Sequence, residues 1–328
     1  MTTSNALNPP GVDILDPIIR HYPPPLGARE GVTAAILRGA LRVGLKPFLG
    51  PPWPAAIQRA ALLIGSSLMP QDGRAQVAAD RIASVTVERV RAKAVVKPRH
   101  AILYLHGGGF FAGSPRTHRS ITTRLAALTG AEVVVPHYSR IPERAFPTQI
   151  NEGVMVYRQL LAEGYTPDRI AIAGDSVGGN LSFMVPMALR LENLPQPGAL
   201  VLMSPALSVR PLPGGSSLER APRDVMIRLA WGEMIEAAYN APHDHPLANP
   251  RGQNLSQLPP TLVQVGDDEV LFDDSMWLAQ EGAKAGRHVE LEVYLKRWHV
   301  FQVHAGLLPS ADQALARQAE FLQRHWAG

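Results

Sequence analysis

Residues 169–180, RIAIAGDSVGGN, decide the fold of this 328-residue chain. A run of apolar residues leads into GDSVG at positions 174–178, which matches the G-x-S-x-G pattern of a nucleophile elbow. In such an elbow a strand turns sharply into a helix, and the serine hydroxyl projects above the sheet beside the positive end of the helix dipole. The short pattern alone also fits a structural glycine turn. Because a strand pattern precedes it and a helix pattern follows it, we predict that Ser176 is a nucleophile.

The chain around this elbow alternates between strand patterns and helix patterns. Apolar runs typical of buried parallel strands occur at residues 101–105, 132–136, 169–173, 199–203, 261–265 and 289–295, after a β-rich region at 84–90 and 93–96. Helical spacing occurs at residues 117–128, 149–163, 179–190, 274–285 and 311–326. The alternation predicts an α/β protein with a doubly wound, mostly parallel sheet and helices on both faces.

Two regions depart from this alternation. Residues 208–258 contain proline, glycine and helical pieces where a short crossover is expected. Residues 1–80 carry helical patches around 34–43 and 53–69, and neither 1–50 nor 53–69 shows a strand pattern. We expect both regions to build a helical cap over the strand ends. The predicted organisation is an N-terminal cap segment, 1–80, and a catalytic domain, 81–328, into which 208–258 is inserted.

Composition excludes several classes of function. Lys and Arg number 32 against 28 Asp and Glu, without a dense basic block, so a nucleic-acid partner is not expected. The absence of cysteine excludes disulfides, thiolate nucleophiles and Cys-ligated metals. The first residues show no signal-peptide pattern, and no apolar run approaches the roughly 20 residues of a membrane span. We therefore expect a cytoplasmic protein without stable membrane insertion.

A glycine-rich segment, His106-Gly-Gly-Gly-Phe110, follows the strand pattern at 101–105. Consecutive glycines allow backbone N–H groups to turn toward a substrate oxygen, as in the HGGG type of oxyanion hole. We predict that the amides of Gly107, Gly108 and Val177 bind the oxyanion. His106 ends a buried strand, so we expect it to orient the glycine loop rather than to act on substrate.

A general base is expected after the last core strand, where the chain reads KRWHVFQ at 296–302. This position makes His299 the candidate, whereas His304 lies further along in a helical, apolar context. His243 and His245 have a spacing that can bind metal, but no third ligand accompanies them. We therefore expect neither a metal nor another cofactor.

The carboxylate that orients the histidine should follow the strand pattern at 261–265. The chain there reads GDDEVLFDD at 266–274, in which five carboxylates compete. Local chemistry does not choose among them. The order serine, acid, histidine is nevertheless the one expected for α/β-hydrolases.

Together these motifs resemble the hormone-sensitive lipase-like carboxylesterases, the bacterial family IV or GDXG group. The matching segments are HGGGF with a following GSP, YSRIPE at 138–143 (family Y-R-L-A-P-E), GDSVGG (family GDSAGG), the acid loop and WHVFQ at 298–302, all in family order. The resemblance covers roughly residues 80–328. It is closest to the branch that holds acetyl-hydrolases and monoterpene lactone hydrolases. It implies an α/β-hydrolase fold and a small-molecule substrate, namely a short- to medium-chain acyl ester.

The resemblance also implies which acid serves. In the family the acid loop is D-P-L-x-D, and Leu271 with Asp273 sets a register that places Glu269 at the acid position, with Asp268 as the alternative. Val177 replaces the usual alanine beside the oxyanion hole. Valine keeps the N–H, and we expect its bulk to narrow the acyl pocket.

Other functions are compatible with parts of this pattern. The same residues would serve a lactone, amide or carbamate hydrolase, because the motifs specify the attack and not the leaving group. A non-catalytic small-molecule-binding relative would be expected to lack the serine or the histidine, and both are present. A homodimer is common in such folds, but no pattern here reports it. Trp53, Trp231, Met226 and Met234 could line an apolar pocket, but a stripe at helical spacing is more often packed core, so the substrate-binding residues stay unknown.

Overall fold

The structure, a computed structural model, describes residues 15–23, 27–208 and 214–326. Within these residues, one sheet has the strand order β1-β9-β8-β7-β6-β4-β5-β3-β2. The strands are β1 (Ile18–Tyr22), β2 (Ala75–Ile82), β3 (Val85–Ala92), β4 (Ala101–Leu105), β5 (Glu132–Pro136), β6 (Ile170–Asp175), β7 (Ala199–Met203), β8 (Thr261–Gly266) and β9 (Val289–Tyr294). Only the β2–β3 and β3–β5 pairs are antiparallel. The predicted mostly parallel α/β sheet is confirmed.

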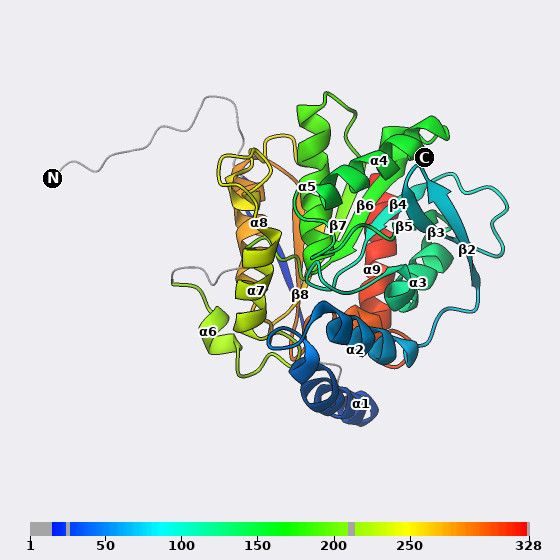
Figure 1. Cartoon of the computed structure of the whole chain (residues 1–328). Helices are drawn as coiled ribbons and strands as arrows, with labels where there is room; N and C mark the ends of the chain where they lie inside the picture. Colours follow the sequence, from blue (N-terminus) through cyan, green and yellow to red (C-terminus); the bar gives the residue numbers. More distant parts are fainter. Residues whose placement is uncertain (1–14, 24–26, 209–213, 327–328) are drawn as a thin grey trace.

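Helices cover both faces of the sheet (Figure 1). β4 is apolar along its whole length because both of its faces are buried: Ile102 and Tyr104 pack on one face, and Leu103 and Leu105 on the other. The first face is covered by α3 (Arg119–Thr129) and α9 (Pro309–His325), and the second by α4 (Thr148–Ala162), α5 (Val177–Leu191) and α8 (Phe272–Lys284).

The first two strands of the chain, β1 and β2, were not predicted from the sequence. β1 pairs in parallel with β9 at the sheet edge, and the side chains of Arg20 and Tyr22 bond Glu290 and Glu292 of β9. The prediction of no strand in residues 1–50 is therefore wrong. The prediction failed because this five-residue edge strand is stabilised by pairing with its neighbouring strand, and its own sequence pattern does not reveal that pairing. β2 also precedes the predicted β-rich region, and residues 93–96 form a turn rather than a strand.

The helices outside these two layers are α1 (Ala28–Ala40), α2 (Ala55–Ser67), α6 (Ser217–Arg220) and α7 (Leu229–Tyr239). In Figure 1, α1 and α2 lie at the lower end of the sheet, and α6 and α7 lie to the left of them. α1 and α2 line a cavity with Ser176, which follows the carboxyl end of β6. The described part of 208–258 contains helical pieces and no strand, as predicted. None of the helices in the described residues is long and apolar enough to span a membrane. Residues 1–14, read above as lacking a signal pattern, lie outside the described residues.

Close packing of β4 against α5 depends on a glycine in the elbow. A Cβ atom on Gly178 would lie 2.0 Å from the carbonyl oxygen of Leu105 and 2.6 Å from the carbonyl carbon of His106. Both are backbone atoms, which cannot rotate away as a flexible side chain would. The last position of the elbow, Gly178, therefore has to be glycine for the helix to start this close to the strand.

We predict that Gly178→Ala destabilises the fold by several kcal/mol, of the order of 4, because the helix must move away from β4. The matched control is Gly39→Ala in α1, where the added Cβ meets nothing within 4 Å. That change should be neutral or stabilising by up to about 1 kcal/mol. Denaturant unfolding of both variants provides the measurement, and equal stabilities would contradict the packing argument.

Candidate active site

Ser176 stands between the last residue of β6 and the first residue of α5. Its backbone is left-handed, with φ 56° and ψ −125°, a conformation that is strained for a residue with a side chain. Two hydrogen bonds hold it there: its N–H donates to the carbonyl of Met203 at 2.9 Å, and the N–H of Ala206 donates to its carbonyl at 3.0 Å. The end of β7 thus stabilises the strained turn.

His299 and Glu269 form a buried pair in the loops after β9 and β8. The Nδ1 atom of His299 lies 2.8 Å from Oε2 of Glu269, and because an ionised carboxylate only accepts, Nδ1–H is the donor. The other oxygen of Glu269 accepts from the Ser204 hydroxyl at 2.8 Å and from the Gly266 N–H at 2.6 Å. Both oxygens are therefore held in place, and the imidazole is oriented through Nδ1.

The protonation of His299 responds to two opposing effects. Burial acts to lower the pKa of His299, but the hydrogen bond and the negative charge of Glu269 outweigh burial and raise this pKa above its usual value. His299 and Ser176 line the same cavity. The structure thus brings together the serine, histidine and glutamate that the sequence analysis selected.

The other four acids of this loop contact groups other than His299. Asp268 forms ion pairs with Arg38 of α1 and, at 3.6 Å, with Arg223. The remaining three acids of the loop contact other groups, namely Asp267 (the Lys296 N–H), Asp273 (Ser216) and Asp274 (Arg251 and the Ser208 N–H). Burial raises the pKa of Asp274 to about 6 even though Arg251 opposes the shift. Of the five carboxylates, Glu269 is the one in contact with His299.

The glycine loop corrects one prediction. The N–H of Gly107 donates to Oδ1 of Asp175 at 3.1 Å, so this amide already has an acceptor inside the protein. The prediction that Gly107 binds an oxyanion is therefore wrong. Gly108 and Gly109, with φ of 121° and 63°, each line a cavity together with Ser176. The candidate donors in this loop are Gly108, as predicted, and Gly109.

Val177 is the third predicted donor. It is the first residue of α5, and the N–H groups of a first helical turn have no acceptor within the helix. Its backbone follows Ser176 directly, and the residue lines a cavity beside Ser176 and Gly109. The valine side chain is 1% exposed, so its bulk occupies the interior next to the serine.

Asp175 was not singled out from the sequence, although it organises the loop. Its carboxylate accepts from the Tyr104 hydroxyl at 2.7 Å and from the Gly107 N–H, and Nε2 of His118 lies 3.2 Å away. Burial acts to lower the pKa of His118, but the charge and hydrogen bond of Asp175 outweigh it and raise this pKa. His106 is fully buried, and its Nδ1 lies 2.9 Å from the Gly107 carbonyl, in keeping with the loop-orienting role expected for it.

Asp224 is a second buried acid that sequence reasoning missed. Its Oδ1 accepts from the N–H groups of Met226 and Ile227 at 2.8 Å each. Its Oδ2 accepts from the N–H of Val270 at 3.1 Å. Asp224 thus forms hydrogen bonds both within its own segment and with the loop that carries Glu269. No spacing in the sequence marks it, because its partners are backbone groups.

Two cavities meet at Ser176. A small one of about 60 Å³ lies beside α7, and a larger one of about 550 Å³ lies along α1 and α2. Trp231 lines both cavities, and Met226 lines the larger one. Trp231 and Met226, whose spacing favoured packed core over pocket lining, thus line cavities that Ser176 also lines.

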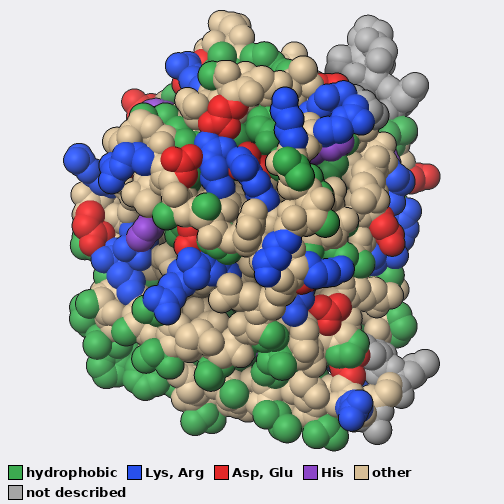
Figure 2. Space-filling model, turned by 90° about the vertical axis from the view of Figure 1, so that its right-hand side faces the viewer, with side chains coloured by type: hydrophobic (Ala, Val, Ile, Leu, Met, Phe, Trp, Pro, Cys, Tyr) green, Lys and Arg blue, Asp and Glu red, His purple; other side chains and the backbone are tan. Residues whose placement is uncertain are grey.

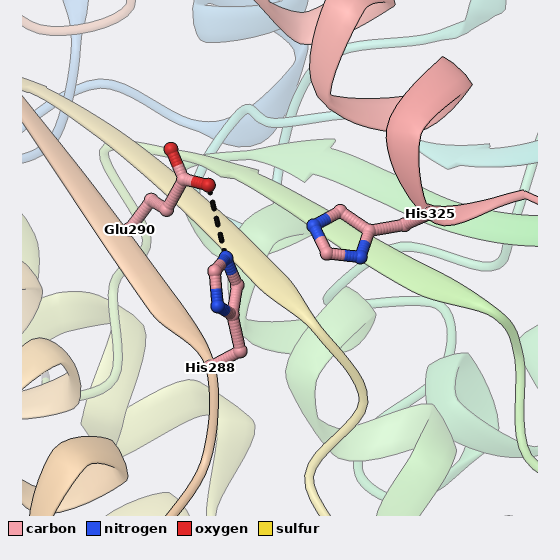
Figure 3. A group of neighbouring side chains, drawn as sticks. All are labelled: His288, Glu290 and His325. Carbon is pink, nitrogen blue, oxygen red and sulfur yellow. Dashed lines mark hydrogen bonds and ion pairs between the residues drawn. The ribbon is translucent and has the colours of Figure 1, made fainter. Parts of the chain in front are cut away.

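A separate histidine–carboxylate group lies at the amino end of β9 (Figure 3). In the described part of the chain it is the one set whose geometry suits a metal ion: His288, Glu290 and His325. His288 Nε2 lies 2.9 Å from Glu290 Oε1, and Glu290 also forms ion pairs with Arg20 and Arg324. These cations already compensate the carboxylate, so we assign no metal to this group.

Comparison with known proteins places this geometry in a family. Residues 102–303 match the model of a family described as having the alpha/beta hydrolase fold. An acetyl-hydrolase of Streptomyces hygroscopicus is 38% identical over 224 residues, which are 68% of this chain and 75% of that protein. An esterase of Acinetobacter venetianus is 36% identical over 263 residues, 77% and 84% of the two chains. A crystal structure of an esterase from the bacterial hormone-sensitive lipase family superposes with a TM-score of 0.83 at 33% identity, covering 92% of this chain and 100% of the other.

The chain therefore belongs to the α/β-hydrolase-fold family. The resemblance to hormone-sensitive lipase-like esterases and acetyl-hydrolases, expected from the motifs, is confirmed.

The Asp175 network gives a test that does not depend on activity. Asp175→Asn keeps the size of the side chain but removes its charge, so burial of His118 is no longer outweighed. We expect the pKa of His118 to fall below its usual value of about 6.5, as measured by NMR titration of the ring. Asp80→Asn, which removes an exposed partner of Arg89, is the control and should leave the titration of His118 unchanged.

Proposed function

We propose that this chain is a serine carboxylesterase in which Ser176 is the nucleophile, His299 the general base and Glu269 the acid that orients it. The observation that carries the proposal is the 2.8 Å contact between Glu269 and His299, in a cavity that Ser176 shares with the histidine. The strained backbone of Ser176 adds support, since strain of this kind accumulates at functional sites. The relatives described as esterases and acetyl-hydrolases agree with it.

The first half of the reaction acylates the enzyme. Nε2 of His299 takes the proton of the Ser176 hydroxyl as the serine oxygen attacks the ester carbonyl. The amides of Gly108, Gly109 and Val177 bind the resulting oxyanion, and one donor of this kind typically contributes about 3 kcal/mol to transition-state stabilisation. His299 then gives its proton to the leaving alcohol, and the acyl group stays on Ser176.

The second half releases the acid by the same route. His299 takes a proton from water, the hydroxide oxygen attacks the acyl carbon, and the same amides bind the second oxyanion. The serine oxygen leaves with the proton that His299 returns. Glu269 keeps its charge throughout and stabilises the imidazolium that forms twice in the cycle.

The sequence predictions also concern the cap, the substrate class, the location and the oligomeric state of the enzyme. We propose that the helices of 1–80 and 208–258 form a cap over the site, and that the substrate is a small-molecule ester with a short- to medium-chain acyl group. A cytoplasmic location and a homodimeric state stay predictions. A panel of esters, lactones, amides and carbamates measures how the leaving group affects turnover.

Ser176→Ala should lower kcat/KM for a short ester by more than a thousandfold, because the residue that forms the covalent intermediate is gone. Covalent labelling by an organophosphonate should disappear in parallel. Ser67→Ala, at an exposed position of α2, is the control and should retain both activity and labelling. Unlabelled wild-type protein would contradict the assignment of Ser176 and favour a non-catalytic binding role.

Glu269→Gln should lower kcat/KM by a hundredfold or more, whereas Asp268→Asn should retain most of the activity because Asp268 faces Arg38. The pH profile gives an independent readout. Activity falls as pH decreases through the pKa of His299, since the protonated ring cannot accept a proton. Glu269 raises this pKa, so the acidic limb should move to lower pH in Glu269→Gln. Loss of turnover in Asp268→Asn with normal turnover in Glu269→Gln would reverse the two assignments.

A further inference from the structure

We infer that the preferred substrate joins a short acyl group to a long, apolar alcohol, an inference that rests on the proposed esterase function. The two cavities that meet at Ser176 differ in size, in chemistry and in which proposed catalytic groups line them. Each difference bears on one half of the ester. Together these differences indicate which cavity holds the acyl half of the ester and which holds the alcohol half.

The small cavity limits the group that it can hold. Its volume of about 60 Å³ corresponds to roughly four water-sized groups, which suits an acyl chain of about two to four carbons. Val177, Ile235 and Trp231 form part of its apolar wall, and each is less than 9% exposed. Asp273 and Asp274 also line it, so a longer alkyl chain would contact carboxylates.

The larger cavity is an apolar groove, lined by α1, α2 and residues 41–49. Its volume is about 550 Å³, and its wall is mostly aliphatic. Ile57, Ile64 and Leu68 lie along it and are 40%, 67% and 74% exposed, so the groove reaches the surface. Figure 2 shows hydrophobic side chains gathered along the lower part of one face, at the level of α1 and α2 in Figure 1, with most charged side chains above them. A long alkyl chain would cover this surface from water.

The proposed catalytic groups show which half of the ester enters which cavity. His299 lines the groove, and it must lie next to the leaving alcohol in order to protonate that oxygen. Of the three proposed oxyanion donors, Val177 and Gly109 line the small cavity, and Gly108 lines the groove. The acyl carbon stays bonded to Ser176 while the alcohol departs on the side of His299. The alcohol therefore lies in the groove and the acyl group in the small cavity.

Trp231 separates the two halves. It lines both cavities, and its side chain is packed so tightly that a Cβ on Gly109 would lie 2.6 Å from its ring. With its carbonyl oxygen on the amides of Gly109 and Val177, the acyl group starts on the small-cavity side of Trp231. The groove is thus available to the alcohol half of the ester.

A pair of isomeric esters tests this inference at constant composition and hydrophobicity. Decyl acetate places the long chain on the alcohol, and ethyl decanoate places it on the acid. We expect kcat/KM for decyl acetate to exceed that for ethyl decanoate by tenfold or more, and to rise along the series of alkyl acetates by up to about fourfold per methylene group. Equal or reversed values, with ethyl acetate still hydrolysed, would overturn the inference and leave the esterase function intact. Failure to hydrolyse ethyl acetate and every other ester would overturn both.

Two matched variants test the groove itself. Ile64 lies in the groove, whereas Ile36 on α1 is equally exposed, at 65% against 67%, and does not line it. Ile64→Asn should reduce kcat/KM for decyl acetate about tenfold and leave ethyl acetate unchanged, and Ile36→Asn should change neither. Ile235→Ala, which enlarges the small cavity, should narrow the gap between the two isomers by raising turnover of ethyl decanoate. An equal loss in the Ile64 and Ile36 variants would overturn the assignment of the groove.

Discussion

One buried carboxylate, that of Asp175, joins the two loops from which the site is built. Asp175 ends β6 directly before Ser176, and it accepts hydrogen bonds from Tyr104 and from Gly107 at the end of β4. A buried charge without partners is costly, so these donors cannot leave it freely. The glycine loop is therefore fixed relative to the nucleophile. Because Gly107 supplies its N–H to this bond, the next two glycines are the ones that face the cavities.

The central sheet was predictable because its signal is local. The strands β4 to β8 are mostly apolar, since helices bury both faces, and glycine-rich turns follow β4 and β6. β1 was not predictable, because its stability comes from pairing with β9 and from bonds of Arg20 to Glu290 across 270 residues of chain. The residues of the candidate site also divide into those with a local sequence signal and those without one. The order of Ser176, acid and histidine could be read from motifs, and Glu269 required the resemblance to a family. Asp175 stands in the GDSVGG motif, but the motif does not show that it bonds Gly107, and no motif marks Asp224.

Helix α2 shows why a helical stripe alone does not reveal a binding surface. Ile57, Ile64 and Leu68 have the spacing of a buried helix face, and the same pattern in α3 or α9 is indeed buried. In α2 this face instead looks into an open groove, because the partner helix α1 stands across a gap rather than in contact along its length. Packing geometry between two segments, which a sequence pattern does not contain, thus decides whether a stripe becomes core or binding surface.

In the proposed mechanism, the preference for acyl-chain length depends on the residue that follows Ser176 in the elbow. In the proposed mechanism the residue after the nucleophile supplies an N–H to the oxyanion, so its side chain lies beside the acyl group. Valine at this position keeps the backbone donor while filling space next to Ser176, and Trp231 encloses the region from the other side. In this proposal the limit on acyl length arises from residues beside the nucleophile, whereas much of the groove wall comes from α1 and α2, which carry none of the proposed catalytic residues. Selection can then alter the alcohol preference by changing α1 and α2 without disturbing the positions of Ser176, His299 or Glu269.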